Sequence, residues 1–211
     1  MFLLFHFACL SSDSCHSYES SALLQFKTQL ITNTTFYENT YYEYVCPNLY
    51  PKMRTWDNGT DCCSWMGVTC HSVSGHVIGL DLSCSGLVDM SSISATASPL
   101  SLIANMSSSL VTALSLANTG IRGHVTSHIL CLPNLQKLYL GGNEDIQIYL
   151  PKLNCSTSLL SVLDLSLCQF PGSQIPSSFS NLTHLTSLYL SASELNALKS
   201  STSDSLGPFR Q

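Results

Sequence analysis

The strongest constraint on the fold is an apolar pattern, L-x-x-L-x-L, that recurs five times in the chain. It begins at Val77, Val111, Leu135, Leu160 and Leu185. The middle apolar positions of the five copies are Leu80, Leu114, Leu138, Leu163 and Leu188. After a longer first interval, these leucines recur about every 25 residues, a period that indicates a stack of similar units in which each unit contacts only its neighbours.

Within each copy, the two leucines of L-x-L point to one side of an extended strand and the residue between them points to the other side. The regular spacing lies within the range of leucine-rich repeats. A conventional parallel α/β sheet would need amphipathic helices of 10–15 residues between its strands, but residues 120–132 and 172–182 carry Gly, Pro and polar residues instead. We therefore expect an α/β-repeat solenoid of about five repeats at residues 77–195.

Two features depart from a regular repeat. The long first interval holds a Ser/Ala-rich insertion at 88–109, which is expected to form a loop or a degenerate half-turn. The position that usually holds Asn within each turn retains it only at Asn143. Weaker hydrogen-bonding side chains at that position predict a less rigid ladder; they are Ser85, Thr119, Cys168 and Ser193.

A solenoid must cover the apolar face of its first repeat, and residues 15–76 are suited to this role as an amino-terminal cap. Residues 21–31 place Leu23, Phe26 and Leu30 at helical spacing, with Ser20 or Ser21 as the N-cap. A zinc site formed by Cys62, Cys63, Cys70 and His71 is the alternative use of the cap cysteines. Adjacent cysteines lack the usual zinc-ligand spacing, so we expect neither metal nor cofactor.

The composition indicates an oxidising, glycosylating compartment. The chain has ten cysteines and an apolar amino terminus, and residues 1–14 are expected to form a signal peptide. Five N-x-[ST] sequons are candidate glycosylation sites: Asn33, Asn58, Asn105, Asn154 and Asn181. The net charge of −5, with no cluster of Lys or Arg, argues against nucleic-acid binding. Residues 196–211 are expected to form an irregular tail.

Several motifs resemble the cap and repeats of plant leucine-rich-repeat receptors, and specifically the kinase-less receptor-like proteins of the Cf type. They are ALLQFK at 22–27, WDNGTDCCSWMGVTC at 56–70, GHVIGLDLS at 75–83, LQKLYLGGN at 135–143 and FPGSQIP at 170–176.

In that family the adjacent cysteines are bridged, which implies the disulfides Cys15–Cys62 and Cys63–Cys70. Cys46 has no obvious partner. The remaining cysteines are compatible with free, buried thiols; they are Cys84, Cys131, Cys155 and Cys168.

The non-leucine strand residues of such a solenoid line its concave face and are the candidate ligand contacts. Tyr139 and Tyr189 are the expected anchors, because aromatic rings with a polar tip dominate protein recognition, and Asp164 between them is expected to pair with a basic ligand group. The other candidates are Asp81, Ser115 and Lys137. No spacing of catalytic residues or kinase motifs is present, so we expect a binding protein rather than an enzyme.

The resemblance implies an extracellular ligand-recognition segment in defence or peptide perception, secreted or on the outer face of the plasma membrane. Its expected partners are a protein or peptide ligand in the apoplast and a membrane receptor kinase. The alternative is a secreted leucine-rich-repeat inhibitor of microbial cell-wall hydrolases. Residues 200–211 continue neither a repeat nor a closing cap, so we also expect a truncated product.

Overall fold

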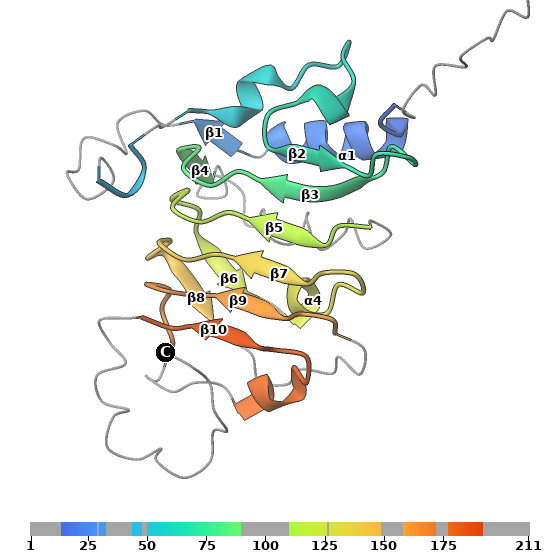
Figure 1. The fold of residues 1–211 in the computed structure, drawn as a ribbon. Helices are drawn as coiled ribbons and strands as arrows, with labels where there is room; N and C mark the ends of the chain where they lie inside the picture. Colours follow the sequence, from blue (N-terminus) through green and yellow to red (C-terminus); the bar gives the residue numbers. More distant parts are fainter. Residues whose placement is uncertain are drawn as a thin grey trace, which may run out of the picture.

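The computed structural model describes residues 14–28, 30–32, 44–47, 50–89, 110–125, 127–148, 158–171 and 177–191. Most of the expected signal peptide, most of the insertion and the whole tail lie outside these residues. Figure 1 shows the described chain as a stack of strands with the cap at one end.

A six-stranded sheet runs the length of the stack in the order β10-β9-β7-β5-β3-β2. Within this sheet β3, β5, β7, β9 and β10 are parallel, and β2 pairs with β3 in the antiparallel sense. The register places the five middle leucines opposite one another, as the period predicts. The strands are β2 (Val68–Cys70), β3 (Val77–Asp81), β5 (Ala113–Ser115), β7 (Lys137–Tyr139), β9 (Val162–Asp164) and β10 (Ser187–Tyr189).

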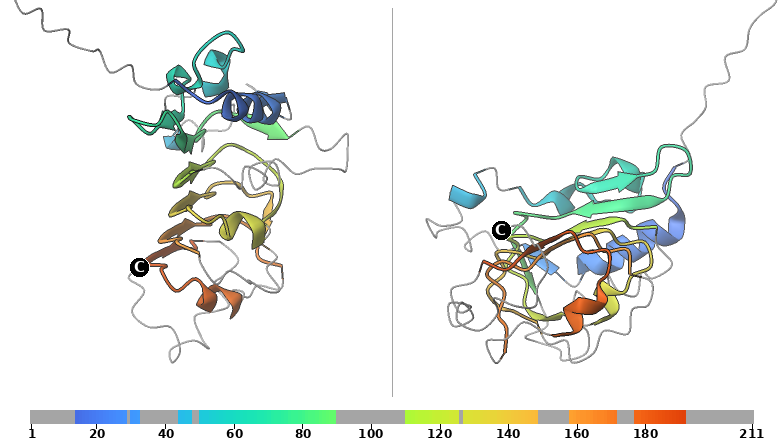
Figure 2. Two further views of the ribbon diagram at one scale, coloured as in Figure 1. Left: turned by 90° about the vertical axis from the view of Figure 1, so that its right-hand side faces the viewer. Right: turned by 60° about the horizontal axis from the view of Figure 1, so that its bottom comes forward.

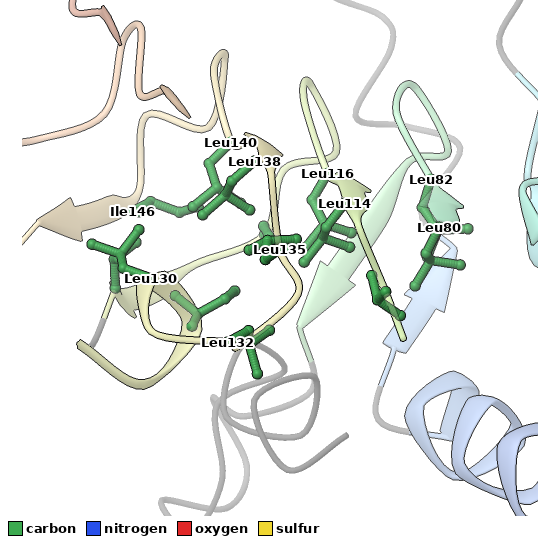
Figure 3. Packing of buried hydrophobic residues seen from close by; sticks show 14 of the residues in the cluster. Leu80, Leu82, Leu114, Leu116, Leu130, Leu132, Leu135, Leu138, Leu140 and Ile146 are labelled. Carbon is green, nitrogen blue, oxygen red and sulfur yellow. The ribbon is translucent and has the colours of Figure 1, made fainter. Parts of the chain in front are cut away.

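The leucines of successive turns form one continuous core behind the sheet. Figure 3 shows Leu80 and Leu82, Leu114 and Leu116, and Leu138 and Leu140 in adjacent rows, with Leu135 and Ile146 packed against them. In these three turns every one of the strand leucines is at most 4 % exposed. Each row is covered by the next, so the burial of one turn depends on its neighbours.

Among the described residues, the side of the repeats away from this sheet contains short elements (Figure 2). The parallel strands β6 (Gly123–Val125) and β8 (Ile146–Ile148) form a second sheet, which Gln169 extends by a single bridge to Gln147. Helix α4 (Ser127–Leu130) and the 3-10 helix η5 (Ser177–Asn181) complete this side. These short elements stand on the described parts of the connections, and the parallel register of the five leucines is that of the leucine-rich-repeat solenoid that the period predicts.

The cap contains α1 (Ser17–Thr28), β1 (Leu30–Thr32) and the 3-10 helices η2 (Lys52–Thr55) and η3 (Cys62–Ser64). The expected helix boundaries were wrong at both ends. Ser20 and Ser21 lie inside the first turns of α1, where their hydroxyls donate to the carbonyl of Ser17. The last part of the expected helix is instead strand β1, although Leu30 is buried as expected.

Strand β1 pairs antiparallel with β4 (Leu87–Asp89), which follows the first repeat. The expected insertion at 88–109 therefore begins with two residues of a strand rather than with a loop. Residues 90–109 lie outside the described residues.

Two tryptophans form the centre of the cap. The rings of Trp56 and Trp65 stack with their centroids 5.5 Å apart. Trp56 Nε1 donates to the carbonyl of Met66 at 3.0 Å, and Trp65 Nε1 donates to the Thr60 hydroxyl at 2.7 Å. Both indoles are thus buried with their only polar atom satisfied, which is the condition under which Trp stabilises a core.

The cap contains the bridges Cys15–Cys62 and Cys63–Cys70 that the family resemblance implies. The sulfur atoms of Cys15, Cys62 and Cys63 lie within 4.8 Å of one another, a spacing that would fit a metal ion, but all three are bonded in disulfides. A disulfide sulfur is not the thiolate that binds zinc.

The interpretation of the other cysteines was partly wrong. Cys46 pairs with Cys84 and so joins the cap to the turn after β3. Cys131 is also disulfide-bonded, whereas Cys168 is free and buried. The Cys46–Cys84 bridge joins residues 38 positions apart in sequence, and no local pattern reports it. Cys155 lies outside the described residues.

The side chains at the Asn position make unequal numbers of hydrogen bonds in the described turns, whereas Ser193 lies outside the described residues, and a less rigid ladder stays a prediction. Asn143 Oδ1 accepts from the amides of Thr119 and Gly120, and Nδ2 donates to the carbonyls of Leu116 and Leu140. Thr119 donates to Leu116 O within its own turn, and the Cys168 thiol makes one weak contact to Leu140 O at 3.5 Å. The buried Ser85 hydroxyl has no partner among the described residues.

Candidate ligand-binding face

The strand register brings five of the six candidate ligand contacts into one column. Asp81 lies opposite Ser115, Ser115 opposite Tyr139, Tyr139 opposite Asp164, and Asp164 opposite Tyr189. Side chains at paired positions of neighbouring strands project from the same face of a sheet. The column is therefore a continuous polar and aromatic stripe on the face away from the leucines.

Lys137 flanks the column, because it lies two residues before Tyr139 on β7 and projects from the same face. It is exposed, as is Tyr189, whose side chain is 53 % exposed. Ser115, Tyr139 and Asp164 are partly buried. Apart from Asp81 on β3, the aromatic and charged members of the stripe are thus gathered on β7, β9 and β10, away from the cap.

Asp81 differs from the rest of the column because a lysine of the cap contacts its carboxylate. Its carboxylate forms an ion pair with Lys52 at 3.1 Å and accepts from both the amide and the hydroxyl of Ser83. Burial acts to raise the pKa of Asp81, but the hydrogen bonds from Ser83 and the Lys52 charge outweigh it and leave the pKa lowered. The contact therefore stabilises the folded chain at neutral pH, and this contribution is lost as the pH falls through the lowered pKa.

Lys52 was not among the predicted site residues. It lies in η2, a separate element of the cap, and no sequence spacing links it to Asp81. The Asp81 carboxylate at the cap end of the stripe is thus paired with a lysine of the cap, although its side chain stays 58 % exposed.

Asp164 is partly buried and differs from Asp81 in its polar partners. Its Oδ1 accepts from the Ser166 amide at 2.9 Å, and no Lys, Arg or His within the described residues forms an ion pair with it. Its carboxylate lies over Gly141, where a Cβ would stand 2.8 Å from both of its oxygens. Glycine at 141 thus leaves the space that this carboxylate occupies.

The free Cys168 lies behind the same strand and is not suited to chemistry. Burial, and to a lesser extent the charge of Asp164, raises the pKa of its thiol to about 12. It is therefore a neutral thiol at physiological pH and a poor nucleophile.

Of the five candidate glycosylation sites, Asn58 and Asn181 lie on described, exposed segments. Asn33, Asn105 and Asn154 lie outside the described residues. Glycosylation of any of the five stays a prediction.

Comparison with known proteins decides the family. The leucine rich repeat N-terminal domain model matches residues 16–39 and 47–71, which include the cap helix and the adjacent cysteines. Receptor-like protein 6 of Arabidopsis thaliana is 31 % identical over 221 residues, covering 90 % of this chain and 22 % of its own length. Receptor-like protein Cf-9 of Solanum pimpinellifolium is 39 % identical over 93 residues, covering 40 % of this chain and 11 % of its own.

This chain belongs to the plant leucine-rich-repeat receptor-like proteins. The matched domain shows that it corresponds to their amino-terminal portion. It spans about a quarter of the length of the receptor-like proteins that it matches over most of its own length.

Among solved structures, the Arabidopsis receptor kinase HAESA, in complex with the peptide hormone IDA and the co-receptor SERK1, is similar with a TM-score of 0.60 and 24 % identity. The match covers 83 % of the receptor-like chain and 25 % of the other. At this identity the likeness establishes the fold. Among the described residues, no helix has both the length and the apolar character needed to cross a bilayer.

Proposed function

We propose that this receptor-like chain forms the first part of an extracellular surface that recognises a peptide or protein ligand. The observation that carries the proposal is the column in which Tyr139, Asp164 and Tyr189 lie opposite one another on adjacent strands. Two amphipathic rings around a charge supply contact area and polarity together, as in the central residues of many protein interfaces.

The proposed setting is the apoplast, on the outer face of the plasma membrane or in secreted form, in defence or peptide perception. The HAESA complex supports this proposal, because a related solenoid binds a peptide hormone together with a co-receptor. By the same analogy, a membrane receptor kinase is the proposed signalling partner. Ser115 and Lys137 are proposed as further contacts beside the two tyrosines, whereas the ion pair with Lys52 assigns Asp81 to cap packing.

The test is a selection of peptides from a random display library on the immobilised full chain. The selected peptides are then measured on the double variant Tyr139→Ala, Tyr189→Ala. We expect at least about tenfold weaker binding, because removing two anchors of an interface costs more than about 1.4 kcal/mol.

The matched control is His124→Ala, which changes an exposed residue of β6 in the second sheet. This variant should bind as the native chain does. Peptides that tolerate loss of both tyrosines would contradict the proposal, as would a chain that selects no peptide.

A further inference from the structure

The sequence Leu-Asp-Leu-Ser occurs twice at equivalent places, at 80–83 and at 163–166. In both copies Oδ1 of the aspartate accepts from the amide of the serine two residues later, at 3.0 Å in the first and 2.9 Å in the second. The two aspartates also occupy the same column of the sheet. The amide contact thus recurs in both copies, whereas among the described residues the serine hydroxyl donates to the aspartate only in the first copy, from Ser83 to Asp81.

The first copy shows what such an aspartate and serine bind. Lys52 Nζ lies 3.1 Å from Asp81 Oδ2 and 3.4 Å from the Ser83 hydroxyl. One ammonium group therefore contacts the free carboxylate oxygen and the serine hydroxyl together. Charge-assisted hydrogen bonds of this kind are among the strongest polar contacts in proteins.

A glycine lies near the aspartate in each copy, against the backbone carbonyl of Asp81 in the first and against the carboxylate of Asp164 in the second. The stem of Lys52 passes close to Gly67, where a Cβ would stand 3.3 Å from Lys52 Cδ. In the second copy, Gly141 lies beneath the carboxylate of Asp164. At neither glycine does a side chain crowd the approach to the aspartate.

The second copy has no lysine of its own among the described residues, and its neighbours in the column are Tyr139 and Tyr189. Because paired side chains project from the same face, both rings flank the approach to Asp164. A cation between aromatic rings gains further electrostatic attraction from their faces.

We propose that Asp164 and Ser166, flanked by Tyr139 and Tyr189, bind the side-chain ammonium of a lysine in a peptide ligand. The Lys52 contact with Asp81 and Ser83 is the internal model for that contact. This inference rests on the proposed function, since it assumes that the ligand lies along the concave face.

The occupied oxygen favours lysine over arginine. Asp164 Oδ1 already accepts from the Ser166 amide, so Oδ2 is the carboxylate oxygen that has no hydrogen bond among the described residues. A guanidinium binds best when it reaches both oxygens of a carboxylate in parallel, whereas an ammonium is a compact charge that needs one strong acceptor.

The experiment uses library peptides selected on the full native chain and measures each on Asp164→Asn. This variant keeps an oxygen that can accept from Ser166 but removes the charge. Asp145→Asn is the matched control, because it removes one negative charge from an exposed site paired with Arg122 rather than from the concave face.

We expect the selected peptides to share a lysine. Replacing that lysine by norleucine, which has the same carbon chain without the ammonium, should weaken binding at least about tenfold on the native chain, and replacement by arginine should weaken it less. On Asp164→Asn the same peptides should bind at least about tenfold more weakly, and the norleucine substitution should no longer matter. Asp145→Asn should leave all of these affinities unchanged.

Peptides that require Tyr139 and Tyr189 but neither a lysine nor Asp164 would overturn this inference and leave the proposed function standing. Arginine peptides that bind more tightly than their lysine counterparts would overturn the choice of ammonium. Binding that is indifferent to the tyrosines and to Asp164 would overturn both proposals, as would the absence of any selected peptide.

Discussion

The cap and the repeats of this receptor-like chain are stabilised in different ways. The cap depends on contacts that each occur once, including the Trp56–Trp65 stack, the disulfide between Cys15 and Cys62, and the buried Glu19, whose carboxylate accepts from the Val77 amide. The repeats instead use one set of contacts again and again, because a leucine row and a backbone ladder recur in each turn.

From this difference we expect the two regions to tolerate substitutions differently. Replacing a unique contact in the cap leaves nothing equivalent to take over its role, and the first repeat then loses its cover. In the repeats, one turn varies while its neighbours hold the register, as the differing residues at the Asn position show. Three experiments would break or sharpen the comparison.

The largest effect is expected from the long-range disulfide of the cap. The double variant Cys15→Ser, Cys62→Ser opens a bridge between residues 47 positions apart, which the loop-entropy relation values at about 4 kcal/mol. Urea unfolding of the full chain measures the loss. Cys63→Ser, Cys70→Ser is the matched comparison, because its residues are 7 apart and the same relation gives about 2.5 kcal/mol. A greater loss from the shorter bridge would show that the entropy of the unfolded chain does not govern the cap.

The next effect tests the strongest turn of the ladder. Asn143→Ala leaves the amides of Thr119 and Gly120 and the carbonyls of Leu116 and Leu140 without this side chain as partner. Because unsatisfied buried polar groups cost about 1–3 kcal/mol each, we expect a loss of roughly 3 kcal/mol in the free energy of unfolding. Glu144→Ala, at the exposed neighbouring position, should change it by less than about 0.5 kcal/mol. Equal effects of the two variants would mean that the ladder contributes little.

The smallest effect is a gain in stability. The turns after β3, β5 and β7 are the first, second and third turns, and Ser85, Thr119 and Asn143 hold the equivalent position in them. The backbone contact between the first and second turns, from Leu82 N to Ser115 O, is repeated between the second and third turns, from Leu116 N to Tyr139 O. Thr119→Asn should therefore reach the first turn as Asn143 reaches the second, and stabilise the chain by about 1 kcal/mol. Thermal unfolding measures the gain, and Thr119→Val, which removes the hydroxyl, should lower the melting temperature. If Thr119→Asn also lowered it, the two turns would not be equivalent.

The sequence predicted the repeat fold, its register and the column of candidate contacts, because a short and regular period fixes which side chains share a face. The cap signature likewise predicted two disulfides through family resemblance. The start of α1 was missed because the serines chosen as caps donate to Ser17 within the helix. The pairing of β1 with β4 was missed because it joins segments on opposite sides of the cap signature, with Ile31 opposite Val88.

What the sequence determined by itself is therefore everything that follows from spacing along the chain: the solenoid, the leucine core and the stripe from Asp81 to Tyr189. Only the tertiary structure decided which of two identical Leu-Asp-Leu-Ser turns forms an ion pair with a lysine and which forms none among the described residues. Lys52 reaches Asp81 from a separate part of the cap, whereas Asp164 lies on β9, with β5 and β7 between it and the strand of Asp81. Such a contact depends on distances between elements that the fold sets, and no periodic pattern in the chain records them.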